Sequence, residues 1–251
     1  MVGPRAAPPG RLIWQLGRVL EVVDETPRCK SIALELPAWT GHRAGQHVDV
    51  RLTADDGYQA QRSYSIASAP DDGQLVLTVE RLEDGEVSPY LVDELRPGDE
   101  LELRGPIGGY FVWEQSFGGP LLLVAGGSGV VPLRAILRYW ARGDREVPAR
   151  LLYSSRSLEE VIYHEELGRL RAEDGADVQL TLTREWPEDW QGHRGRVNQR
   201  LLEEIAWSPE ARPLSYVCGP TAFVETVAEA LVNAGHEPSR IRTERFGPTG
   251  T

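Results

Sequence analysis

A glycine-rich stretch, AGGSGVVP at residues 125–132, has the residue types of a diphosphate-binding turn. It follows the apolar run 121–125, which is typical of a buried strand, and precedes a helix predicted over 132–142 by its apolar face. Glycines in such a turn let a phosphate approach the backbone N–H groups at the helix N-terminus. Pro132 fits the first helical turn, where its missing N–H costs no hydrogen bond. Unless this is a tight turn without a ligand, the predicted nucleotide-binding residues are Gly127, Ser128, Gly129 and Pro132.

Arginines and hydroxyl groups follow the next two predicted strands. An NAD-type site usually has an Asp or Glu after its second strand, which binds the 2′-hydroxyl of the ribose. The strand predicted over 150–154 instead runs into Ser-Ser-Arg, and the strand predicted over 178–183 ends in Thr-Arg. Guanidinium and hydroxyl groups suit a 2′-phosphate, although solvated arginines without a ligand remain the alternative. The predicted phosphate-binding residues are Ser155, Arg156, Thr183 and Arg184.

The first half of the chain carries a second cluster of this kind. Arg62-Ser63-Tyr64-Ser65 combines a cation for a diphosphate, a ring that could stack on a flat cofactor, and hydroxyls that could bond a ring nitrogen. By itself Arg-x-Tyr in a strand usually reflects packing. A further anion site is predicted at Gly85, Val87 and Ser88, with Ser88 as N-cap and Pro89 opening a short helix over 89–95. Anion sites in both halves of the chain imply two ligands.

The pattern of predicted secondary structure changes near residue 115. Before it, short alternating strands such as 46–52 and 75–79 are separated by Asp-Gly and Pro-Gly turns, which predicts an antiparallel β-barrel. After it, strands alternate with amphipathic helices, which predicts a parallel α/β sheet. The predicted domains are therefore 11–115 and 116–251, preceded by a loose, Pro/Gly/Ala-rich arm at 1–10.

Three elements complete the predicted α/β domain. Ser157 and Glu160 form a capping box that should open a helix over 158–170. A further helix is predicted over 197–206, and a last strand over 241–246.

Composition narrows the classes of function. The net charge of −11 disfavours general affinity for nucleic acid or anionic membranes, and no apolar run approaches the ~20 residues of a membrane span. Two cysteines, Cys29 and Cys218, are too few for an iron–sulfur cluster held by four thiolates. The N-terminus has no charged-then-apolar leader, so a cytoplasmic location is expected. The five histidines lack metal-ligand spacing and are interpreted as surface or capping residues; they are His42, His47, His164, His193 and His236.

Taken together, these motifs resemble the ferredoxin–NADP reductase family over residues 11–246. The resemblance implies a six-stranded antiparallel FAD-binding barrel followed by an NAD(P)-binding α/β domain. It implies that Arg62 binds the flavin pyrophosphate, Tyr64 stacks on the isoalloxazine and Ser65 bonds N5. The segment from Gly85 to Ser88 is similar to the second flavin-phosphate segment, and the glycine loop has Ser128 where the family has Thr. Thr183-Arg184-Glu185 resembles the segment that binds the 2′-phosphate.

Two further motifs resemble the family's nicotinamide and flavin contacts. A lone buried cysteine is more often a small apolar filler, but Cys218-Gly219-Pro220 resembles the pair beside the nicotinamide, where Cys218 would shape the pocket rather than act as a nucleophile. Glu244-Arg245-Phe246 is similar to the C-terminal Glu-x-aromatic that places a carboxyl near N5 and a ring over the flavin. Here Phe replaces Tyr, and five residues follow it.

The function implied is hydride transfer from NADPH, with NADH possible, to FAD. Electrons would then pass to a separate ferredoxin or oxygenase component. A reductase of free flavin, oxygen or small acceptors is the first alternative, and a nucleotide-binding module without flavin is the second.

Overall fold

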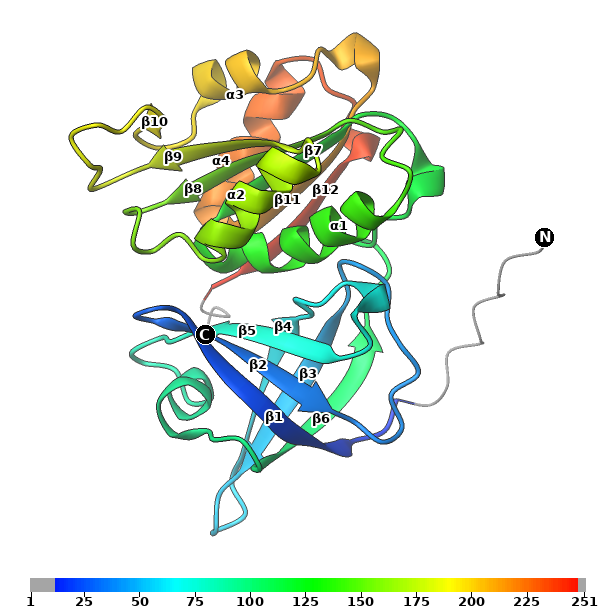
Figure 1. Cartoon of the computed structure of the whole chain (residues 1–251), viewed down its shortest axis with the longest axis vertical. Coiled ribbons are helices and arrows are strands. Elements are labelled where there is room, and N and C mark those ends of the chain that lie inside the picture. Colours follow the sequence, from blue (N-terminus) through cyan, green and yellow to red (C-terminus); the bar gives the residue numbers. More distant parts are fainter. Residues whose placement is uncertain (1–11, 248–251) are drawn as a thin grey trace.

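The computed structural model describes residues 12–247, so the predicted arm at 1–10 lies outside the described part. Two layers of strands are visible in Figure 1: a strongly twisted antiparallel sheet, and above it a parallel sheet flanked by helices. This arrangement confirms the predicted fold class.

The antiparallel sheet has six strands in the order β4-β3-β6-β1-β2-β5. Its open edges, β4 and β5, approach each other through a bridge between Ile66 and Leu77, which brings the sheet towards closure. Alternation predicts the inward faces: Leu75, Leu77 and Val79 on β5 are almost fully buried in the barrel core. The strands are β1 (Gln15–Thr26), β2 (Cys29–Glu35), β3 (His47–Thr53), β4 (Gln59–Ser65), β5 (Leu75–Glu80) and β6 (Glu100–Ile107).

The parallel sheet also has six strands, in the order β10-β9-β8-β7-β11-β12. Its central strand β7 is buried on both faces: Leu121 and Leu123 join the cluster under α1 and α2, whereas Leu122 and Val124 join the cluster under α3 and α4. The strands are β7 (Leu121–Gly126), β8 (Ala149–Ser155), β9 (Asp177–Leu182), β10 (His193–Arg194), β11 (Leu214–Pro220) and β12 (Ile241–Phe246). The helices are α1 (Val130–Arg142), α2 (His164–Glu173), α3 (Gln199–Ile205) and α4 (Thr221–Asn233).

Short helical turns connect these elements. One is a π-helical turn, η2 (Tyr90–Glu94). The others are 3-10 turns: η1 (Pro70–Asp72), η3 (Gln115–Phe117), η4 (Gly127–Gly129), η5 (Pro209–Ala211) and η6 (Pro238–Arg240).

The helix predicted over 158–170 is wrong at its start, because α2 begins only at His164. The preceding residues Val161, Ile162 and Tyr163 are buried, and the backbone N–H of Ile162 donates to the hydroxyl of Tyr153. Burial of this irregular segment overrides the local capping signal at Ser157, and the helix instead begins after a left-handed residue, Tyr163, at φ +63°.

The cap predicted at Ser88 is also wrong. The residue that precedes η2 is Pro89, and no side chain caps this turn. The Ser88 hydroxyl is buried and accepts a hydrogen bond from the backbone N–H of Leu82. Ser88 is itself the first helical residue, and its hydroxyl closes the preceding loop rather than capping the helix.

The two sheets share a hydrophobic core. Cys29, Ala44 and Ala67 of the barrel belong to the same buried cluster as β7 and α1. Polar bonds also cross the seam between the domains: the Tyr163 hydroxyl donates to Thr78, and the Tyr216 hydroxyl donates to the carbonyl of Val112. The seam is therefore a packed interface, and residues of both domains determine its geometry.

An ion-pair network at the edge of the seam ties α1 to the barrel. The Asp72 carboxylate accepts from Arg138 at 2.9 Å and from Arg142, and Arg138 and Arg134 also contact Glu166. Burial would raise the pKa of Asp72, but its bonds to the amide of Ala69 and to the guanidinium groups outweigh burial and lower it.

We expect Asp72→Asn to lower the free energy of unfolding at pH 7 by about 2 kcal/mol, because charged hydrogen bonds are lost while Arg138 stays partly buried. Since the pKa of Asp72 is lowered in the folded state, this stabilisation is present above about pH 4 and disappears as the pH falls through the folded-state pKa. Urea unfolding at pH 7 and pH 3 measures it. The exposed neighbour Asp71→Asn is the control, and an equal loss in both variants contradicts the expectation.

Candidate functional site

The glycine loop lies at the carboxyl edge of the parallel sheet. η4 joins β7 to α1, and Val130, Val131 and Pro132 form the first turn of α1, as predicted. A Cβ on Gly129 would lie 2.1 Å from the carbonyl oxygen of Cys218, so only glycine allows the loop to pack this closely against β11. The loop predicted to bind a diphosphate therefore lies directly beside the predicted nicotinamide residues.

The four residues predicted to bind a 2′-phosphate are brought together at the ends of β8 and β9. The backbone N–H of Thr183 donates to the carbonyl of Ser155, and that of Arg184 to the carbonyl of Arg156, both at 2.9 Å. Ser155 is buried, whereas both arginines are exposed. Two guanidinium groups are thus attached to neighbouring backbone segments at one edge of the sheet. The Nη1 atom of Arg156 also forms an ion pair with Oε2 of Glu160 at 3.7 Å.

On the barrel side, Arg62, Ser63, Tyr64 and Ser65 lie on β4, which pairs with β3 along these residues and leaves its other edge without a paired strand. Unpaired strand edges carry free N–H and C=O groups that a ligand can use. Tyr64 is half-buried against the barrel core. The hydroxyl of Ser63 donates to the buried Asp49 at 2.7 Å.

The segment from Gly85 to Ser88 lies against this edge. Arg62 contacts the carboxylate of Glu86 at 2.6 Å, and the Tyr58 hydroxyl bonds the same carboxylate. Val87 is fully buried and anchors the segment in the barrel core. The two predicted flavin-phosphate segments, 62–65 and 85–88, therefore lie side by side. The carboxylate of Glu86 lies between them and contacts Arg62.

One histidine connects the predicted catalytic residues across the seam. His47 pairs with Ser65 in the β3–β4 register, and its Nδ1 lies 4.0 Å from Oε1 of Glu244 on β12. Glu244 in turn pairs with Cys218 in the parallel register of β11 and β12. Paired residues in a sheet share a face, so Ser65, His47, Glu244 and Cys218 form one continuous line that ends beside Gly129.

The interpretation of the histidines as surface or capping residues is therefore wrong for three of them. His47 lies at the seam, His42 contacts the carbonyl of Ser68 at 2.9 Å, and His236 is buried. The signal for His47 was its position two residues after Gly45, at the start of the strand that pairs with Arg62–Ser65.

Burial shapes the protonation of this line of residues. Burial raises the pKa of Glu244 to about 7, and one of its oxygens, Oε2, is buried without a hydrogen-bond partner among the described residues. Burial and then the charge of Glu244 raise the pKa of Cys218, which keeps the thiol protonated. Burial lowers the pKa of His47, and the charge of Asp49 partly offsets this effect. A protonated thiol agrees with a pocket-shaping role for Cys218.

Phe246 ends β12 opposite Pro220 and is half-buried against the core shared by the two domains. It therefore lies at the same edge as the Cys218-Gly219-Pro220 turn. The stacking of Phe246 on a flavin stays a prediction.

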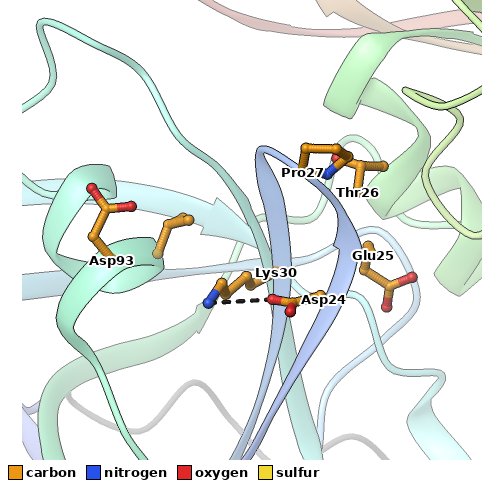
Figure 2. A pocket seen from close by; sticks show the side chains of 7 residues that line it. Asp24, Glu25, Thr26, Pro27, Lys30 and Asp93 are labelled. Carbon is orange, nitrogen blue, oxygen red and sulfur yellow. Dashed lines mark ion pairs between the residues drawn. The ribbon is translucent and has the colours of Figure 1, made fainter.

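A hollow of about 460 Å³ lies elsewhere, between the tip of the β1–β2 hairpin and η2. Figure 2 shows Lys30 paired with Asp24 on the hairpin, and Asp93 on η2 on the other side of the hollow. None of the predicted cofactor residues lines this hollow. We therefore do not assign it to either cofactor.

Comparisons with known proteins match two domain families along the chain. The oxidoreductase FAD-binding domain family matches residues 20–112, and the oxidoreductase NAD-binding domain family matches residues 123–229. Ferredoxin–NADP reductase B of Sorangium cellulosum is 37% identical over 210 residues, which cover 81% of this chain and 84% of that protein. These matches define a chain with an oxidoreductase FAD-binding domain and an oxidoreductase NAD-binding domain. The chain belongs to the ferredoxin–NADP reductase family.

Two other relatives extend this comparison. The glycine betaine monooxygenase reductase subunit of Pseudomonas aeruginosa is 31% identical over 239 residues, which cover 93% of this chain and only 64% of that subunit. The FAD/NAD-binding domain of a nitric oxide dioxygenase from Vibrio cholerae superposes with a TM-score of 0.84 at 28% identity, covering 93% of this chain and 99% of that domain. Within residues 12–247, no helix is long and apolar enough to cross a membrane.

We expect Glu244→Gln to stabilise the protein by about 2 kcal/mol at pH 8, because the folded state must otherwise hold a buried carboxylate. The pKa of Glu244 is raised to about 7 in the folded state, so the cost grows as the pH rises from the unfolded-state pKa towards 7 and is absent at pH 4. Urea unfolding at pH 4 and pH 8 measures the difference. The exposed Glu229→Gln on α4 is the control, and a variant less stable than the original at pH 8 contradicts the expectation.

Proposed function

We propose that this protein is an FAD-dependent NAD(P)H oxidoreductase that transfers a hydride from NADPH to FAD and passes electrons to a separate acceptor. The observation that carries the proposal is the line of residues from Ser65 through His47 and Glu244 to Cys218, which joins the two predicted cofactor sites at the seam. Hydride transfer needs two rings in contact, and only residues that converge from both domains can hold them so.

The barrel would hold the flavin. Arg62 would bind the pyrophosphate together with the Gly85, Val87 and Ser88 segment, exchanging its contact with Glu86 for the diphosphate. Tyr64 would stack on the ring, the backbone around Ser63 would line its edge, and the Ser65 hydroxyl would donate to N5. FAD supplies the hydride-accepting ring and can release electrons singly, whereas the protein supplies orientation and electrostatics.

The parallel sheet would hold the nicotinamide nucleotide. The glycine loop with Gly127, Ser128, Gly129 and Pro132 would bind the diphosphate at the start of α1. Preference for NADPH is supported by Arg156 and Arg184, which leave adjacent backbone beside Ser155 and Thr183, and by the absence of an acid at the end of β8. Cys218, Gly219 and Pro220 would shape the nicotinamide pocket, and Phe246 would cover the flavin.

The acceptor is proposed to be a ferredoxin or an oxygenase component. Relatives are named as reductase components of a naphthalene dioxygenase system and of a 3-ketosteroid-9-alpha-monooxygenase, and one as a ferredoxin–NADP reductase. We also propose domain limits of 11–115 and 116–251, supported by the family matches at 20–112 and 123–229. A cytoplasmic location is proposed because Cys29 and Cys218 are both free thiols.

An absorbance spectrum followed by anaerobic titration tests the proposal. We expect the purified protein to bind FAD stoichiometrically and NADPH to bleach the flavin absorbance in one two-electron step. The reduced flavin is then reoxidised either by added ferredoxin or by free riboflavin. Comparison of the two distinguishes electron transfer to a protein from reduction of free riboflavin. A protein that binds no flavin, or a flavin that neither NADPH nor NADH bleaches, contradicts the proposal.

We expect Arg184→Ala to weaken the binding of NADPH about 10–100-fold and to leave the binding of NADH nearly unchanged. Each charged hydrogen bond to the 2′-phosphate contributes about 1.5–3 kcal/mol. Titration of both nucleotides by fluorescence or flavin reduction measures the ratio. Arg169→Ala, exposed on α2, is the matched control. Equal losses for NADPH and NADH remove Arg184 from the phosphate site.

A further inference from the structure

The phosphate end of the predicted flavin site carries two residues to which the proposed function gives no role, Tyr58 and Glu86. One oxygen of the Glu86 carboxylate accepts from Arg62 at 2.6 Å, and the other accepts from the Tyr58 hydroxyl. The side chains of Arg62 and Glu86 are about half exposed, and Tyr58 is 57% exposed. The three residues therefore meet at the surface, on the side of β4 where the segment 85–88 lies.

Tyr58 is held in place although it is exposed. It lies directly before β4, in a turn closed by a bond from the backbone N–H of Ala54 to the Tyr58 carbonyl at 2.9 Å. Its own N–H donates to the Asp56 carboxylate at 2.9 Å, and its hydroxyl donates to Glu86. A ring that is fixed at both ends, with more than half of its surface exposed, loses little conformational entropy when a second ring stacks on it.

The loop that carries Glu86 is equally constrained. The backbone N–H of Gly85 donates to the carbonyl of Leu82 at 3.0 Å, and the next residue after Glu86, Val87, is fully buried. A Cβ on Gly85 would lie 2.8 Å from the hydroxyl oxygen of Ser88, so the loop is closed too tightly for a larger residue. The carboxylate of Glu86 is therefore presented beside Arg62 by a compact loop.

The residues along β4 follow the order of the parts of FAD. Tyr64, predicted to stack on the flavin ring, and Arg62, predicted to bind the diphosphate, are two residues apart and share a face of the strand. At a rise of about 3.3 Å per residue, Arg62 lies about 7 Å from Tyr64, and Tyr58 about 13 Å farther in the same direction. In FAD the flavin ring, the diphosphate and the adenosine follow one another in this order, whereas FMN ends at its phosphate.

The charges around Glu86 leave its carboxylate able to accept from a ligand. The hydrogen bonds from Tyr58 and then Arg62 lower the pKa of Glu86, so this group is ionised at neutral pH. The neighbouring Arg81 is engaged by Asp93 at 2.8 Å and by Glu83 at 3.6 Å. If Arg62 turns to a diphosphate, one oxygen of Glu86 is released, and carboxylates commonly accept from the ribose hydroxyls of dinucleotides.

We propose that Tyr58 and Glu86 are specificity-determining residues that hold the adenosine half of FAD and so select FAD over FMN. Tyr58 stacks on the adenine ring, and Glu86 accepts hydrogen bonds from the adjacent ribose. The proposal rests on the function proposed above, which places the flavin ring at Tyr64 and the diphosphate at Arg62. Both flavins can use those two residues, so discrimination between them has to come from the adenosine.

Isothermal titration calorimetry of the flavin-free full chain with FAD and with FMN measures this selectivity as a ratio of dissociation constants. We expect the original protein to bind FAD more tightly than FMN, by on the order of tenfold or more. Tyr58→Ala should weaken the binding of FAD about tenfold and leave that of FMN within about twofold, because stacking on an aromatic ring is lost. Tyr58→Phe keeps the ring and should retain FAD binding within about threefold.

The carboxylate is tested in the same way. We expect Glu86→Ala to lower the selectivity for FAD about fivefold, because hydrogen bonds to the ribose are lost. Asp55→Ala, which removes an exposed carboxylate from the same turn as Tyr58, is the control and should leave the binding of both flavins unchanged. A variant that only destabilises the barrel weakens both flavins alike, so the ratio separates recognition of adenosine from a loss of structure.

These outcomes also separate the two proposals. Equal affinity for FAD and FMN in the original protein, or an unchanged ratio in Tyr58→Ala, overturns the adenosine site even if NADPH reduces the bound flavin normally. Conversely, a bound flavin that NADPH does not reduce overturns the proposed function, while the ratio still reports on Tyr58 and Glu86. If Tyr58→Ala fails to fold, the ratio in Glu86→Ala decides the question, and an unchanged value there overturns the proposal.

Discussion

The packed contact between the carboxyl edge of the parallel sheet and the β3–β4 edge of the barrel is the constraint on which the site depends. Parallel strands end at one edge, so the glycine loop, the Cys218 turn and Phe246 all lie there. The barrel presents His47 and Ser65 to that edge. Without this contact each domain would keep its own predicted phosphate-binding residues, but the two halves of the candidate site would be separated.

The core that the domains share makes this contact specific. Small barrel residues, Cys29, Ala44 and Ala67, pack into the cluster beneath α1. Around this core, Asp72 and the arginines of α1 form ion pairs, and Tyr163 and Tyr216 donate hydrogen bonds across the seam. Apolar packing supplies buried area, and the directional polar bonds constrain the relative orientation of the two domains.

Charge is distributed unevenly along this interface. At its rim, carboxylates are matched by guanidinium groups, as Glu166 is by Arg134 and Arg138. At the candidate site, Glu244 has a neutral thiol on one side and an imidazole on the other. Rim carboxylates are thus held ionised for stability, whereas the carboxyl at the centre is poised to change its protonation state.

Local sequence determined much of this protein, and tertiary contacts decided the rest. The glycine loop, the alternation of Leu75, Leu77 and Val79, and the apolar run of β7 predicted their elements because turn geometry and strand periodicity act over a few residues. The family motifs predicted both domains and most of the candidate site residues.

The helix start at Ser157 and the cap at Ser88 were wrong because burial of Tyr163 and the bond to Leu82 outweigh local capping. His47 was missed for a related reason. Its environment is made by Glu244, which lies at the other end of the chain, and no local pattern records a contact that exists only after the two domains dock.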